Sequence, residues 1–159
     1  MLQPRRLVAA ALAVAATATI AASASAAPAG CLGQPSETWL NVSVEGLRNG
    51  SGLLTVAVYP DDSRQFLAKG GTLKNNRFQA SAPVTRACVF VPKPGVYAVA
   101  VYHDEDSSRK LNRSGLGLPA EGYGFSNNPA TLAGLPAFRS VRLNVPKAGL
   151  TTHIRMKYP

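Results

Sequence analysis

The sequence predicts an all-β fold, an antiparallel sandwich of about seven strands that carries one long irregular loop. No segment after residue 26 shows a long helical period. Apolar and polar residues instead alternate in several short runs, as in strands that bury one face. Residues 27–159 also have the length of one ordinary domain, enough to enclose a hydrophobic core.

The first residues have the pattern of a secretory signal peptide. Two arginines at positions 5–6 precede an apolar run over 7–22, and an A-x-A site of small residues ends at Ala26. We therefore expect cleavage of a signal peptide over 1–26, which leaves a single domain over 27–159. The alternative is a membrane anchor that stays, but the run is rich in weakly apolar alanine, whereas a stable span needs about 20 strongly apolar residues. We therefore expect cleavage and no stable transmembrane segment after it.

Two other interpretations of the start stay open. The arginine pair also occurs in twin-arginine signals, and Cys31 after Ala29 and Gly30 resembles a lipoprotein attachment site. All of these interpretations export the chain, so we expect a periplasmic or secreted protein. In an oxidising compartment Cys31 and Cys88, the two cysteines, should form a disulfide. Free thiols, or lipidation of Cys31, are the alternatives.

The charge of the chain is basic, with 17 Lys and Arg against 8 Asp and Glu. Loss of Arg5 and Arg6 with the signal peptide leaves a mature net charge of +7. Such a charge suits anionic lipid headgroups, polysaccharides or acidic proteins, and also an ordinary solvated surface. We expect no nucleic-acid partner, because the compartment is wrong and no recognition motif occurs.

The alternating segments give the expected strands. They cover residues 40–45, 54–58, 78–80, 88–91, 96–103, 141–145 and 152–158. The segment 96–103 is apolar on both faces, which predicts a central strand. Matching the apolar positions predicts two hairpins, one with Val44 opposite Val56 and one with Val145 opposite Leu150.

Two stretches lack a strand pattern. Residues 60–75 predict one short helix, capped within 61–63, with Phe66 and Leu67 facing inward. Residues 104–136 exceed the usual length of a connection, and such loops are typically functional or disordered. Apolar anchors predict that this loop folds onto the end of the sandwich. The anchors are Leu111, Leu116, Leu118, Tyr123, Phe125 and Leu132.

Two motifs frame this loop. The strand before it reads G-x-Y-A-V-x-V-Y-H-D over 95–104, and P-x-E-G-Y-G-F-S-N-N occupies 119–128. With matches at 46–49 and 52–54, they resemble the secreted bacterial family catalogued as domain of unknown function 2141, over essentially the whole mature chain. The resemblance implies a prealbumin-like or immunoglobulin-like sandwich, an unassigned function and no known catalytic residues.

Members of that family usually carry a run after the histidine that looks like the start of an EF-hand calcium loop. The matching positions here are Asp104, Asp106, Ser108 and Asn112. Arg109 stands where the turn favours glycine, and Gly115 stands where the bidentate carboxylate belongs, so Glu121 is the obvious substitute. We expect either a calcium site or a turn held by Asx side chains, and no other cofactor.

The candidate ligand-binding residues lie in and around the long loop: His103, Asp104, Glu121, Tyr123, Phe125 and Asn127. A catalytic interpretation would use His103, with Asp104 or Glu121 orienting it and Ser126 as nucleophile. However, no G-x-S-x-G or H-E-x-x-H motif occurs. We expect His103 to be a hydrogen-bonded structural residue with Glu121 beside it, and the aromatics to pin the loop or line a groove.

The expected function is a non-catalytic binding or interaction module of the periplasm or cell envelope, for an envelope ligand or protein that the sequence does not identify. An ion-stabilised structural envelope domain is the first alternative. A hydrolase-type enzyme that uses His103 and nearby carboxylates is the second. An enzyme needs these groups to converge in a pocket, whereas a binding module needs an exposed groove with aromatic side chains.

Overall fold

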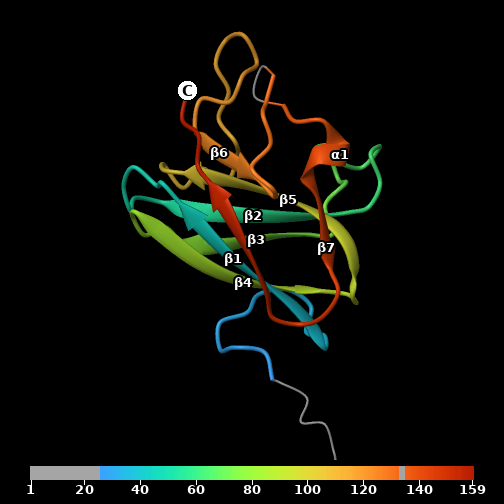
Figure 1. The fold of residues 1–159 in the computed structure, drawn as a ribbon. Helices are drawn as coiled ribbons and strands as arrows, with labels where there is room; N and C mark the ends of the chain where they lie inside the picture. Colours follow the sequence, from blue (N-terminus) through green and yellow to red (C-terminus); the bar gives the residue numbers. More distant parts are fainter. Residues whose placement is uncertain (1–25, 133–134) are drawn as a thin grey trace, which may run out of the picture.

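A computed structural model describes residues 26–132 and 135–159. The predicted signal peptide therefore lies outside the described residues, except for Ala26. Two β-sheets face each other as a sandwich, so the predicted fold class is confirmed (Figure 1). The elements in chain order are β1 (Thr38–Glu45), β2 (Leu53–Pro60), β3 (Lys74–Gln79), β4 (Val84–Val91), β5 (Gly95–Asp104), β6 (Gly122–Phe125), α1 (Phe138–Val141), β7 (Arg142–Val145) and β8 (Leu150–Arg155).

The strands form one sheet in the order β4-β1-β8 and a five-stranded sheet in the order β3-β2-β5-β6, in which β7 also pairs with β5. Strand β5 is central, as predicted. It pairs with β2 along one edge, while its other edge is shared by β7 near Gly95 and by β6 near His103. One pair departs from an antiparallel sandwich, because β8 runs parallel to β1.

Both predicted hairpins are wrong. Strands β1 and β2 lie in different sheets, and so do β7 and β8. The alternating pattern identifies the buried face of each strand correctly, but the two sheets of a sandwich bury their inner faces against the same core. Facing apolar positions therefore do not distinguish hydrogen-bonded neighbours from strands that pack across the core.

The predicted helix in 60–75 does not form. The Asp62 carboxylate caps a turn by accepting a hydrogen bond from the amide of Arg64, but Leu67 has a φ of 58° and turns the chain away. Phe66 packs inward against Tyr59, whereas Leu67 is 40% exposed. The single turn of helix in the described residues is α1.

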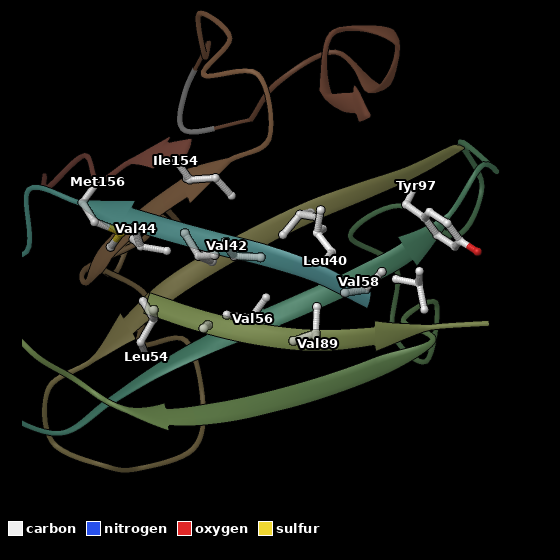
Figure 2. Packing of buried hydrophobic residues seen from close by; sticks show 14 of the residues in the cluster. Leu40, Val42, Val44, Leu54, Val56, Val58, Val89, Tyr97, Ile154 and Met156 are labelled. Carbon is white, nitrogen blue, oxygen red and sulfur yellow. The ribbon is translucent and has the colours of Figure 1, made fainter. Parts of the chain in front are cut away.

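The core lies between the sheets, and β1 and β2 contribute its centre (Figure 2). A second, smaller cluster covers the outer face of the five-stranded sheet. It contains Ala57, Tyr59, Ala98, Ala100, Phe125 and Val141, with Phe66, Tyr123 and Phe138 packed against them. Strands β2 and β5 are thus buried on both faces, which explains why the sequence of β5 is apolar throughout.

The N-terminal segment is joined to β4. Cys31 and Cys88 form a disulfide with a Cα–Cα distance of 4.4 Å, and the predicted pairing is confirmed. The neighbouring Leu32 donates its amide hydrogen to the carbonyl of Cys88 and accepts one from Phe90. Within the described residues, no helix is long and apolar enough to cross a membrane.

Candidate functional site

The outer face of the five-stranded sheet carries a groove. Ala57 on β2 lies opposite Ala100 on β5, and the small side chains of this pair form its floor. Larger residues flank them, because Tyr123 on β6 lies opposite Tyr102 and Phe125 lies opposite Ala100. The hollow has a volume of about 290 Å³, near the lower limit for a small-molecule site.

Two irregular segments complete the groove. Leu67 and Lys69 come from the turn after β2, while Leu111 and Arg113 come from the long loop between β5 and β6. The lining includes two basic side chains, Lys69 and Arg113, and no acidic residue among those described. An apolar floor between aromatic walls, with two basic side chains beside it, fits a ligand with an apolar body and an anionic group.

The aromatic side chains of this face form a connected group. Phe66 lies edge-on to Tyr59 at 5.3 Å between ring centroids, and Phe125 lies 5.9 Å from Tyr123. Burial raises the pKa of the Tyr59 hydroxyl, and neighbouring Tyr102 raises it further. Tyr123 is half-buried and Phe125 is buried, so the predicted partial burial of both is confirmed. They both pin the chain to the sheet and line the groove.

The long loop is ordered by its own backbone hydrogen bonds. Arg113 and Pro119 form a β-bridge, the amide of Ser114 donates to Leu118, and Ala120 donates to Asn112. These bonds and the buried Pro119 hold the described part of 104–136 at the end of the sheet. The expectation that all six apolar residues anchor it is wrong, because Leu116, Leu118 and Leu132 are exposed.

His103 does not line the groove. It is fully buried in the inner layer, with Nε2 at 2.8 Å from the carbonyl of Ser51 and Nδ1 at 2.8 Å from the Tyr158 hydroxyl. The expectation that Glu121 accompanies it is wrong, since the carboxylate beside Nδ1 is Glu105, at 3.5 Å. Side chains alternate along β5, so His103 and Asp104 point to opposite faces of the sheet. Glu121 lies beside Asp104 and therefore away from His103.

Glu121 instead joins Asp104 and Asp106. One oxygen from each of these carboxylates lies within 4.8 Å of the others, and Asp104 and Glu121 are buried. The amides of Ser108 and Arg109 donate to Asp104 at 2.9 and 2.7 Å. These bonds are typical of Asx turns.

Asn112 bridges the other two carboxylates, because its Nδ2 donates to Asp106 and its amide donates to Glu121. Burial raises the pKa of Glu121, and the charges of Asp104 and Asp106 raise it as well. Hydrogen bonds from Ser108 lower the pKa of Asp106 to about 2, and the bond from the Ser108 backbone has the largest effect. None of the three carboxylates forms an ion pair within 26–132 and 135–159.

The remaining candidate residues hold the chain in place. Ser126 is buried, accepts a hydrogen bond from the amide of Val99 and donates one to the carbonyl of Val141. It forms no hydrogen bond with His103, so the residues of the catalytic alternative are not brought together. Asn127 has a φ of 64° and donates to the carbonyl of Arg142 at 2.8 Å.

A larger hollow, of about 650 Å³, lies over the three-stranded sheet. Its walls include residues 28–30 at the start of the described chain, and three of its polar side chains already have partners. His153 lies 3.0 Å from Glu45, and Asn41 donates to the carbonyl of Gly149. We therefore favour the groove as the ligand site.

Sequence reasoning identified Tyr123 and Phe125 but missed Tyr59, Tyr102, Lys69 and Arg113. The sequence does indicate the two tyrosines, because each alternates along its strand with the valines that fill the core and so points to the outer face. The two basic residues come from irregular segments and carry no comparable signal.

Comparison with known proteins places the chain in one family. The family model described as "Uncharacterized protein conserved in bacteria (DUF2141)" matches residues 42–153, and the chain belongs to this family. No curated protein and no solved structure matches the chain.

Proposed function

We propose that this protein is an exported, non-catalytic binding module of the periplasm or cell envelope. The observation that carries the proposal is the groove, with its floor of Ala57 and Ala100 between aromatic walls. Lys69 and Arg113 at the rim favour a small ligand with an anionic group on an apolar body. The disulfide between Cys31 and Cys88 supports export, because such bonds persist in oxidising compartments.

The experiment is native mass spectrometry of the protein purified from the envelope of its own cells. The wild type should carry an unmodified small molecule. Ala100→Leu should lose it, because a larger side chain fills the floor, and Lys69→Gln should retain less of it. Lys74→Gln is the matched control, because Lys74 is exposed and lies outside the groove. Equal loading of all four proteins, or chemical turnover of the bound molecule, would contradict the proposal.

The acidic cluster supports a second candidate function, an envelope domain whose long loop is stabilised by calcium. Asp104, Asp106 and Glu121 supply the hard oxygen ligands that calcium prefers. Thr55, a diagonal neighbour of Asp104 across β2 and β5, is fully buried, and its hydroxyl has no hydrogen-bond partner in the described chain. Such a group needs a bound water or ion to satisfy it.

Thermal unfolding with calcium, with magnesium and with a chelator tests this candidate. At a calcium concentration of about 100 times Kd, a bound ion adds about 2.7 kcal/mol to the stability of the folded state. Glu121→Gln should remove the calcium response, whereas Asp62→Asn, a change in an unrelated turn, should keep it. An unfolding temperature that is the same in calcium and chelator would rule the candidate out, and Glu121 would then be a structural clasp.

A further inference from the structure

Exposed leucines gather around the groove on the outer face of the five-stranded sheet. Seven large apolar side chains are exposed in the described chain, and six of them, all but Leu32, lie on segments that contribute residues to the groove. Leu73 directly precedes β3, and the other five lie in the turn after β2 and in the two stretches that flank β6. These five are Leu67, Leu116, Leu118, Leu132 and Leu135. Leu67 and Leu135 line the groove together with Arg113 and Pro119, so segments distant in sequence meet here. We call these five residues the leucine rim.

The most exposed members of the rim stand on segments that make backbone hydrogen bonds. Leu116 is 87% exposed at the tip of a turn that is closed by hydrogen bonds from Ser114 to Leu118 and from Gly117 to Ser114. Leu132, also 87% exposed, exchanges two backbone hydrogen bonds of 3.0 Å with Leu135. In Figure 1 the orange segments before and after β6 extend beyond the sheets at the same end. The backbone therefore holds these side chains out in water.

The charges beside the rim are basic. Residues 107–120 include Arg109, Lys110 and Arg113 and no acidic residue, and residues 122–159 include no acidic residue either. The carboxylates near the rim already have partners: Asp61 and Asp62, which precede Leu67, pair with Arg142 and Arg64. In the acidic cluster at the base of the loop, Asp104 and Glu121 are buried and Asp106 is exposed, and all three accept hydrogen bonds. Exposed apolar tips flanked by positive charge match the surface chemistry of an anionic bilayer.

We propose that this end of the protein docks onto an anionic lipid bilayer, with the leucine rim entering the interface and Arg109 and Lys110 binding headgroup phosphates. The arrangement favours lipid over a protein partner, because the two most exposed leucines, Leu116 and Leu132, stand on separate segments before and after β6. A bilayer admits several tips at once, whereas a protein interface needs a contiguous complementary core. The inference does not depend on the groove holding a ligand.

Cosedimentation of the exported protein with phosphatidylglycerol-containing vesicles and with pure phosphatidylcholine vesicles tests the docking. The wild type should bind the anionic vesicles more strongly and lose that preference in high salt. The double variant Leu116→Ser/Leu132→Ser should bind at least about tenfold more weakly, because two apolar side chains no longer leave water. Leu32→Ser is the matched control, since Leu32 is also exposed but lies beside β4.

A double variant that removes two positive charges tests the proposed binding of headgroup phosphates. Arg109→Gln/Lys110→Gln should weaken binding to anionic vesicles about 30-fold, the effect of two basic residues near a charged surface. Neither side chain makes a hydrogen bond or ion pair in the described chain, so the fold should survive. Lys93→Gln/Lys147→Gln, before β5 and after β7, removes the same charge at the opposite end of β5.

Retention of binding by both control variants and loss by both rim variants, with unchanged thermal unfolding, would support the proposal. Equal binding of the wild type to neutral and anionic vesicles would overturn it. So would an equal loss in the controls, or full binding by the leucine variant.

Discussion

The hydroxyl of Tyr158 lies 2.8 Å from Nδ1 of His103 and ties the C-terminal tail to the end of β5. A carbonyl can only accept, so Nε2 of the same ring donates to the carbonyl of Ser51, and in the tautomer with the hydrogen on Nε2 alone Nδ1 accepts the Tyr158 hydrogen. The Tyr158 oxygen in turn accepts the amide hydrogen of Arg48, whose guanidinium lies 4.6 Å from the centre of the tyrosine ring.

Removal of this hydroxyl should destabilise the fold. Tyr158→Phe leaves a buried ring nitrogen and a backbone amide without partners, and we expect a loss of about 1–3 kcal/mol in the free energy of unfolding. Urea denaturation measures it. Tyr102→Phe is the control, because the Tyr102 hydroxyl makes no hydrogen bond in the described residues, and it should change stability by less than about 0.5 kcal/mol. Equal effects of the two changes would contradict this role for Tyr158.

Gly124 allows β6 to lie close to β8 of the other sheet. A Cβ at this position would lie 2.7 Å from Cγ2 of Ile154 and 2.9 Å from the carbonyl oxygen of Arg155. Gly124→Ala should therefore destabilise the protein by about 1–3 kcal/mol, a typical cost of overpacking. Gly115→Ala has open space around it and should be neutral or slightly stabilising. Thermal unfolding of the two variants should rank them in that order; a stable Gly124→Ala would refute the close packing.

The ion pair between Asp61 and Arg142 gives the protein a pH dependence. Hydrogen bonds of 2.7 and 2.6 Å from the guanidinium lower the pKa of the Asp61 carboxyl. A pKa that is lower in the folded state adds stability above the unfolded pKa, and this stability disappears as the pH falls through the folded pKa.

In Arg142→Gln the pKa of the Asp61 carboxyl should rise toward its ordinary value. Carbon NMR of that carboxyl during an acid titration measures this change. The effect on stability should be small, because both side chains are partly exposed. Arg139→Gln removes an arginine of α1 that makes no ion pair within the described residues, and it should leave the Asp61 titration unchanged. A carboxyl pKa that is identical in wild type and Arg142→Gln would contradict the pairing.

The sequence predicts which face of each strand is buried, but it does not predict which strands pair with one another. Alternation in β1 and β2 identified the residues that fill the core, but the connection over 46–52 crosses between sheets instead of forming a hairpin. The local alternation does not indicate whether a connection forms a hairpin or crosses to the other sheet. That depends on which strands pair with β1, here β4 and β8.

The lining of the groove was predicted in part for a similar reason. Strand phase predicts which face Tyr123 and Phe125 occupy, and the disulfide follows from the two cysteines. Glu121 was assigned to the wrong partner because loop geometry decides which carboxylate reaches His103. There, Gly52 approaches the backbone of Asp104 and Glu105 so closely that a Cβ would collide with it. This contact between distant segments is not visible in the sequence.

Intact-mass analysis of the exported protein tests processing and redox state together. We expect a chain that begins at Ala27, because the small-residue site ends at Ala26, and that lacks the two thiol hydrogens of Cys31 and Cys88. The chain-entropy model assigns the disulfide about 4 kcal/mol as an upper estimate. A diacylglyceryl mass on a chain that begins at Cys31 would instead identify a lipoprotein, and the disulfide would then be excluded.

The central claim, a ligand groove on the outer face of the five-stranded sheet, is tested most directly by NMR. The amide resonances of the labelled protein are followed while the small-molecule fraction of an envelope extract is added. We predict shifts concentrated at Ala57, Ala100 and Tyr123, and none of them in Ala100→Leu. Shifts concentrated at Arg86 and Thr151 over the three-stranded sheet, or no shifts at all, would contradict the account.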